Sequence, residues 1–205
     1  MKVYGDIKSG NCYKVKLLLS LLGIRHEWIE LDILAGETQT EAFLAMNPNA
    51  KIPLLVLDNG KSLAESNAIL GYLAEQTDLI PKDPFAKAKV YEWLFFEQYS
   101  HEPFIAVARF INKYLGLPAE RLEEYQQKQP GGHKALAIME KHLKDNQYLV
   151  GDSYTIADIS LYAYTHVADE GGFDLSAYPA LLAWLNKISS HPKHIGMQLK
   201  AKDRG

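Results

Sequence analysis

The stretch that decides the fold is residues 47–66, N-P-N-A-K-I-P-L-L-V-L-D-N-G-K-S-L-A-E-S. Its apolar run, Leu54 to Leu57, has the length of a short strand, and the turn residues Asp58-Asn59-Gly60 follow it. Because such a turn joins two antiparallel strands, residues 54–63 are predicted to form a β-hairpin. Pro53 cannot donate to a β-ladder, so the hairpin is expected to begin at a sheet edge, and Ile52-Pro53 is a bond in which the cis form costs little.

A sheet edge of this kind can receive an extended peptide. The N–H and C=O of Ile52 are available in this arrangement for hydrogen bonds to a ligand backbone. A helix is expected to start at Ser66, where helix N–H groups and a hydroxyl favour a carboxylate, and Glu65 offers a charge suited to an ammonium group. The stretch therefore predicts a receptor for a short peptide with a free α-amino acid at one end, and glutathione is such a molecule. In the alternative interpretation, Ser62-x-x-Glu65 is a capping box and Glu65 only satisfies backbone donors.

N-P-x-x-K-I-P, followed about a dozen residues later by E-S, resembles the glutathione-site signature of the glutathione transferases. The resemblance covers essentially the whole chain. It implies an α/β thioredoxin-like N-terminal domain plus an all-α C-terminal helical domain. It also implies that glutathione is the co-substrate and that its site contains Lys51, Ile52, Pro53, Glu65 and Ser66.

Composition is that of an ordinary globular protein, with 205 residues, 47% of them hydrophobic and 23% charged. The net charge of −3 gives no reason to expect nucleic acid or an anionic membrane as a partner. No segment approaches the roughly 20 apolar residues that span a bilayer, and the start Met1–Asp6 lacks a signal-peptide pattern. Cys12 is the only cysteine, so intrachain disulfides are excluded and a reducing cytoplasm is expected. No metal site is expected.

The order of elements before residue 78 is predicted to be β-α-β-α-β-β-α. Short strands are expected around Val3-Tyr4 and within residues 26–33, and helices over residues 15–22, 37–46 and 66–76. Gly23 stands where a C-cap glycine belongs. A right-handed crossover followed by an antiparallel hairpin gives a small mixed sheet with helices on both faces.

Residues 77–84 carry little to bury and are predicted to be a linker, which sets the domains at 1–78 and 85–205. Pro103 is expected to kink or split a long helix over residues 86–115, and Pro130-Gly131-Gly132 to interrupt a second helix over residues 119–146. Thr155 with Asp158 forms a capping-box pattern at the start of an apolar, central helix. A last helix is expected over residues 179–189, and a frayed end from Lys200.

Ser9 and Asn11 lie between the first strand and the first helix, where the sulfur of bound glutathione is expected. A free thiol has a pKa of ~8.5, and only its thiolate attacks. Lowering that pKa by about two units needs about 2.7 kcal/mol, which hydroxyl, amide and helix N–H donors together can supply. Ser9 resembles the donor of the theta and zeta classes, and Asn11 that of the bacterial nu class. Ser9 is predicted to be the main thiolate donor, with Asn11 the alternative.

Three other residues near that loop are assigned to packing. Cys12 could form a mixed disulfide, but it stands later than the cysteine of the cysteine-using classes, so a buried side chain is expected. Tyr4 and Tyr13 lie within the predicted strand and helix.

The second substrate is expected to be a small hydrophobic electrophile in a cleft between domains. Candidate walls are Tyr99, His101, Phe104, Ala108, Phe110, Tyr162 and His166. Thr38, Gln39 and Lys51 compete for the glycine carboxylate of glutathione, and Lys51 is favoured. The resemblance further implies a homodimer, formed by the first and second domains of opposite subunits.

The resulting hypothesis is a detoxifying glutathione transferase that activates the glutathione thiol as a thiolate. Two alternatives remain open: a glutathione-dependent disulfide-bond oxidoreductase and a non-catalytic glutathione-binding regulatory module.

Overall fold

The computed structural model describes residues 1–197, which divide into two compact units. Unit 1 comprises Met1–Gln76 together with the described residues from Pro192 onward, and unit 2 comprises Thr77–His191. Residues 192–197 therefore pack with the first unit, whereas the sequence-based domain bounds of 1–78 and 85–205 assign them to the second. The reason is a set of tertiary hydrogen bonds, among them one from the Tyr13 hydroxyl to the carbonyl of Ile195 at 2.7 Å. The end from Lys200 lies outside the described residues.

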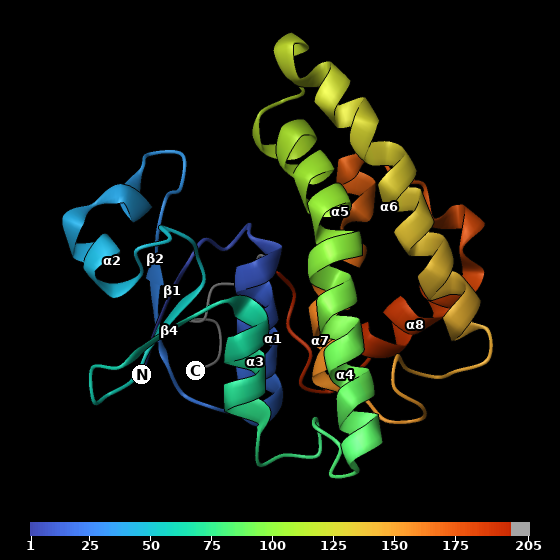
Figure 1. The fold of residues 1–205 in the computed structure, drawn as a ribbon, viewed down its shortest axis with the longest axis horizontal. Coiled ribbons are helices and arrows are strands. Elements are labelled where there is room, and N and C mark those ends of the chain that lie inside the picture. Colours follow the sequence, from blue (N-terminus) through green and yellow to red (C-terminus); the bar gives the residue numbers. More distant parts are fainter. Residues whose placement is uncertain (198–205) are drawn as a thin grey trace. The chain divides into compact units, whose positions relative to one another are not determined.

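Unit 1 contains a four-stranded mixed sheet in the order β2-β1-β3-β4 (Figure 1). Strand β1 pairs in parallel with β2 and antiparallel with β3, and β3 pairs antiparallel with β4. The strands are β1 Lys2–Gly5, β2 Glu27–Glu30, β3 Leu54–Val56 and β4 Ser62–Ala64. The predicted hairpin and the parallel pairing of the first two strands are confirmed; β2 and β3 are shorter than expected, and β1 is longer.

Three α-helices complete the predicted element order in unit 1: α1 Gly10–Leu22, α2 Glu41–Met46 and α3 Ser66–Ala74. Helices α1 and α3 lie side by side on one face of the sheet, and α2 lies on the other (Figure 1). Gly23 has φ 67° and caps α1 as expected. The helix expected over residues 37–46 is split, because Thr40 is extended and its side chain caps α2 by accepting from the N–H of Phe43.

A cluster of fully buried side chains in unit 1 joins the sheet to α1 and α3. It contains one residue from each of β1 and β3, two from α1 and one from α3: Val3, Leu55, Val15, Leu19 and Ile69. These residues belong to the apolar patterns from which the strands and helices were predicted, so the same side chains specify both the elements and their packing.

Unit 2 is helical throughout its regular structure, as predicted. A nearly continuous helical run begins with α4 Pro84–Phe96, passes through a π-helical segment at Glu97–His101, and continues as α5 Glu102–Arg109 and a second π-helical segment at Phe110–Tyr114. The other helices are α6 Leu122–Leu143, α7 Ile156–Thr165 and α8 Pro179–Ser189, with short 3-10 turns at Glu37–Gln39 in unit 1 and at Ala119–Arg121, Ala168–Gly171 and Leu175–Ala177 in unit 2.

The helical run expected over residues 86–115 is not broken at Pro103. Pro103 falls in the first turn of α5, directly after the π-helical segment Glu97–His101, so the local change at this proline is one of helix type.

The interruption predicted at residues 130–132 is wrong, because α6 runs unbroken through Pro130. The two glycines there serve close packing between elements. A Cβ on Gly131 would overlap the ring of Phe104, and a Cβ on Gly132 would overlap the ring of Phe173. The glycines are thus explained by neighbours that a local sequence pattern does not reveal.

Helix α7 begins with the predicted capping box and is buried along its whole length. The Asp158 carboxylate accepts from the Thr155 N–H at 2.9 Å, the Leu149 N–H at 3.0 Å and the Trp184 indole N–H at 2.9 Å. Asp158 therefore fixes a helix start, a preceding loop and α8 together.

No helix within residues 1–197 has the length and apolar character needed to cross a membrane.

Candidate functional site

Ser9 is the N-cap residue of α1. Its Oγ accepts from the N–H of Cys12 at 3.4 Å, and its own N–H donates to the carbonyl of Asp6 at 3.0 Å. The Asp6 carboxylate in turn accepts from the N–H of Lys8 at 2.7 Å. A hydroxyl that accepts a cap bond keeps its proton as a donor, so Ser9 can still donate to an anion at this helix start.

Asn11 and Ser66 are brought together across α1 and α3. The Ser66 hydroxyl donates to Asn11 Oδ1 at 3.2 Å, and it accepts from the ammonium of Lys14 at 3.3 Å. Ser66 is the first residue of α3, so its hydroxyl lies beside the N–H groups that open this helix. The residue predicted for a carboxylate thus touches a residue predicted for a thiolate.

The Ile52-Pro53 bond is cis. The expectation that the hairpin begins at a sheet edge is wrong, because β3 lies between β1 and β4. Pro53 precedes the first ladder position, Leu54, and its lack of an N–H therefore removes no ladder bond. Within residues 1–197 the backbone N–H and C=O of Ile52 make no hydrogen bond, and Ile52 stands just before an interior strand, β3.

Glu65 is the N-cap residue of α3 and has φ 66° and ψ 113°, a backbone conformation that non-glycine residues adopt at a cost. Its side chain makes no cap hydrogen bond, and the Ser62 hydroxyl donates instead to the carbonyl of Met46. The interpretation in which Ser62 and Glu65 form a capping box is therefore wrong.

Lys51 and Gln39 are exposed, whereas Thr38 is buried. The backbone carbonyl of Lys51 accepts from the side-chain amide of Asn47 at 2.8 Å, which fixes the loop before Ile52. Within residues 1–197, neither Lys51 nor Ile52 is hydrogen-bonded to Asn11 or Ser66.

Sequence reasoning missed Lys14. Its side chain is completely buried, although it lies in the apolar pattern of α1 where a charge is expected to face solvent. The available signal was its position three residues after Asn11, which places both on one side of a helix.

Cys12 is packed, as predicted. Its side chain has no exposed surface, and burial raises the pKa of the thiol to about 12. Tyr4 packs edge-on against Phe43 with ring centroids 6.3 Å apart, so it too is a packing residue. The Tyr13 hydroxyl is held by the carbonyl of Ile195.

Several residues named for the second substrate are structural. His101 is fully buried and its Nε2 lies 2.9 Å from Thr165 Oγ1. Tyr162 stacks on His166, with ring centroids 4.7 Å apart, and burial raises the pKa of Tyr162 to about 12. Ala108 is fully buried, whereas Tyr99 is 80% exposed.

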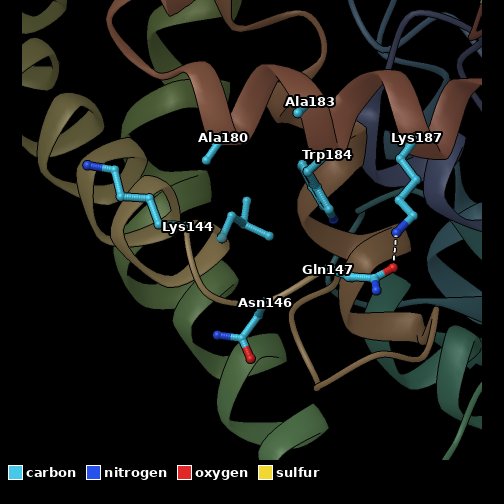
Figure 2. Close-up of a pocket in the computed structure, with 8 residues that line it drawn as sticks. Lys144, Asn146, Gln147, Ala180, Ala183, Trp184 and Lys187 are labelled. Atoms are coloured by element: carbon cyan, nitrogen blue, oxygen red, sulfur yellow. Dashed lines mark hydrogen bonds between the residues drawn. The ribbon is translucent and has the colours of Figure 1, made fainter.

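A separate hollow of 410 Å³ lies in unit 2 between the end of α6 and α8 (Figure 2). Lys187 closes one side by donating to the side chain of Gln147, and Trp184 contributes an indole that is bound to Asp158. None of the residues predicted for glutathione lines it.

Among residues 1–197, no group of three or more His, Cys, Asp or Glu side chains is placed to hold a metal ion.

A thioredoxin-like unit combined with an all-helical unit is the fold of the glutathione transferases. Residues 9–76 match the family model for the glutathione S-transferase N-terminal domain, and residues 93–192 match the one for the C-terminal domain. The chain belongs to the glutathione S-transferase family of enzymes, for which glutathione is the co-substrate.

Three relatives illustrate the range of the similarity. A crystal structure of a glutathione S-transferase from Pseudomonas fluorescens [Pf-5] is 61% identical, with a TM-score of 0.94, over 96% of this chain and 98% of that one. Glutathione S-transferase 3 of Zea mays is 33% identical over 94% of this chain and 90% of its own. The disulfide-bond oxidoreductase YfcG of Escherichia coli (strain K12) is 30% identical over 94% and 92%.

Proposed function

We propose that the protein binds glutathione in unit 1, activates its thiol as a thiolate and directs it at a small hydrophobic electrophile. The observation that carries the proposal is the hydrogen bond of 3.2 Å between Ser66 and Asn11. It joins the start of α3, which suits a carboxylate, to the start of α1, which suits a thiolate. A peptide the size of glutathione is expected to bridge these two helix starts while its backbone pairs with Ile52.

In the proposed complex, each predicted site residue contacts a particular group of glutathione. Ser66 and the N–H groups of α3 receive the α-carboxylate of the γ-glutamyl end, and Glu65 receives its ammonium. The cysteinyl backbone pairs with Ile52, beside Pro53, and Lys51 receives the glycine carboxylate.

The reaction then needs no protein nucleophile and no metal. Ser9, with Asn11 and the N–H groups of α1, stabilises the thiolate and so lowers the pKa of the bound thiol. The proton leaves to solvent, and binding of an electrophile next to the sulfur supplies proximity. Conjugation of such electrophiles is a detoxification reaction, and we place it in the cytoplasm because a chain with one buried cysteine needs no oxidising compartment.

The thiolate itself provides the test. The ultraviolet absorbance of bound thiolate, followed against pH, reports the pKa of the glutathione sulfur in the complex. We expect Ser9→Ala to raise that pKa most and Asn11→Ala to raise it less. As a control, Ser62→Ala removes an exposed hydroxyl that donates to the carbonyl of Met46 and has no other hydrogen bond within residues 1–197, and it should leave the pKa of the bound thiol unchanged. Full turnover by Ser9→Ala with loss in Asn11→Ala would reverse the order of the two donors.

Disulfide reduction is the second candidate function, favoured by the similarity to YfcG. Faster turnover of 2-hydroxyethyl disulfide than of chlorodinitrobenzene would support it. Glutathione binding without thiolate formation near neutral pH would instead support a non-catalytic module.

We also propose a homodimer. Tyr91, Phe95 and Tyr99 recur every four residues along α4 and the following π-helical segment, and they are 40%, 64% and 80% exposed. An aromatic stripe of this kind is typical of a surface covered by a partner.

A further inference from the structure

Helix α1 buries two lysines. Lys14 is fully buried and Lys16 is 4% exposed. An ammonium group removed from water is costly unless it is hydrogen-bonded or paired. The Lys16 ammonium faces the carbonyl of Met197 at 3.4 Å and lies 5.8 Å from the centre of the Trp28 ring, so it holds the described end of the chain. The Lys14 ammonium is instead 3.3 Å from the Ser66 hydroxyl.

The contact with Lys14 gives the Ser66 hydroxyl a direction. An ammonium group can only donate, so the Ser66 oxygen must be the acceptor and its O–H must turn away from Lys14. In the structure that O–H is aimed at Asn11 Oδ1. With a neutral side chain in place of Lys14, the direction of the Ser66 O–H is no longer fixed. The O–H can then turn towards residue 14 and leave only the oxygen lone pairs facing a bound carboxylate, which also needs a donor.

Resting on the proposed function, we propose that Lys14 is a positioning residue for the α-carboxylate of glutathione. Its ammonium holds the Ser66 hydroxyl as a donor and places a positive charge behind the carboxylate subsite at the start of α3. Because the ammonium is shielded from water, its attraction for an anion next to Ser66 is weakly screened. Lys14 acts through Ser66 and does not itself contact the ligand.

The test compares glutathione with 4-aminobutyryl-cysteinyl-glycine, which lacks only the α-carboxylate of the γ-glutamyl end. Calorimetric titration of the full chain gives the ratio of the two dissociation constants. We expect Lys14→Met to reduce the preference for glutathione by about tenfold or more, because a charge-assisted interaction is lost. Lys14→Arg keeps the charge and should retain the preference. Lys16→Met, the matched control, removes a buried ammonium from the same helix and should leave the ratio at the wild-type value.

A packing role for Lys14 would weaken binding of both compounds equally and leave their ratio unchanged, and this result would overturn the proposal. If Lys14→Met does not fold, Lys14→Gln carries the same test, with a neutral side chain that still forms hydrogen bonds. A wild-type protein that binds neither compound would refute the glutathione site itself. Glutathione binding with a ratio independent of residue 14 would refute the role of Lys14 alone.

Discussion

Cys12 stands three residues after the proposed thiolate donor Ser9, yet its surroundings make it unreactive. Its thiol is fully buried, and burial raises its pKa to about 12, so it is protonated at neutral pH. We expect a disulfide reagent such as Ellman's reagent to label Cys12 in denaturant but not in the folded protein. Stoichiometric labelling of the native chain, or a mixed disulfide with glutathione on Cys12, would contradict a packing role.

The partly buried ion pair between Arg109 and Glu170 gives the free energy of unfolding a pH dependence. Burial by itself would raise the pKa of Glu170, but the guanidinium 2.7 Å away, with Lys113 nearby, lowers it below the ordinary value of 4.5. A carboxyl whose pKa is lower in the folded state stabilises the fold above its unfolded pKa, and that contribution is lost as pH falls through the folded pKa.

We therefore expect the free energy of unfolding of the wild type, measured with urea, to fall as pH drops below about 4.5. Glu170→Gln should be less stable near neutral pH, because it removes the carboxylate that pairs with the Arg109 guanidinium, and its stability should fall less on acidification. Glu120→Gln alters an exposed carboxylate and serves as the control. Parallel pH profiles for wild type and Glu170→Gln would contradict this account.

At the scale of single residues, the sequence indicated some positions and missed others. Ser9, Asn11 and Ser66 were proposed as site residues because each stands at or just before a predicted helix, where a hydroxyl or amide group can act together with the helix N–H groups. Lys14 was missed because its burial depends on α3, a helix about 50 residues further along the chain. Thr40 was not recognised as a helix cap. A polar residue inside an apolar pattern is compatible with both a continuous helix and a broken one, so the local sequence does not distinguish the two.

At the start of α7, one side chain connects three segments of unit 2. Asp158 accepts from three buried N–H donors, on Thr155, Leu149 and Trp184. We expect Asp158→Ala to lower the free energy of unfolding by about 3 kcal/mol or more, because each donor loses its partner without gaining water. Asp83→Ala removes the exposed cap of α4 and should cost about 1 kcal/mol. Equal losses in the two variants would show that Asp158 acts as a helix cap only.

Glycine-to-alanine substitutions in α6 and α3 compare the effect of close packing with that of helix propensity on stability. Replacing glycine by alanine inside a helix ordinarily stabilises it by up to about 1 kcal/mol. Gly71→Ala in α3 should do so because, among residues 1–197, no atom outside the adjoining backbone lies within 4 Å of the new methyl group. Gly131→Ala would press on the ring of Phe104, and we expect it to destabilise the protein by about 1–3 kcal/mol. Thermal unfolding of both variants decides the matter, and stabilisation by Gly131→Ala would contradict the close packing of α5 on α6.

At the scale of the whole molecule, the proposed dimer can be measured directly. We expect sedimentation to give twice the chain mass of 23.1 kDa for the wild type. Phe95→Ser combined with Tyr99→Ser should yield a folded monomer, because the aromatic stripe on α4 would lose most of its apolar area. Ile138→Ser changes an exposed apolar residue of α6 and should leave the dimer intact. A monomeric wild type, or a dimeric double variant, would contradict the proposal.

The sequence by itself determined the order of the elements, the helical character of unit 2, the capping box of α7 and the glutathione signature around residues 47–66. Each of these depends on residues within about twenty positions of one another, through helix and strand periods, caps, turns and a short motif. Only the tertiary structure decided that β3 is an interior strand, that α6 continues through Pro130 and that Lys14 lies behind Ser66. Burial and close approach are set by partners distant in the chain, and no local pattern carries that information.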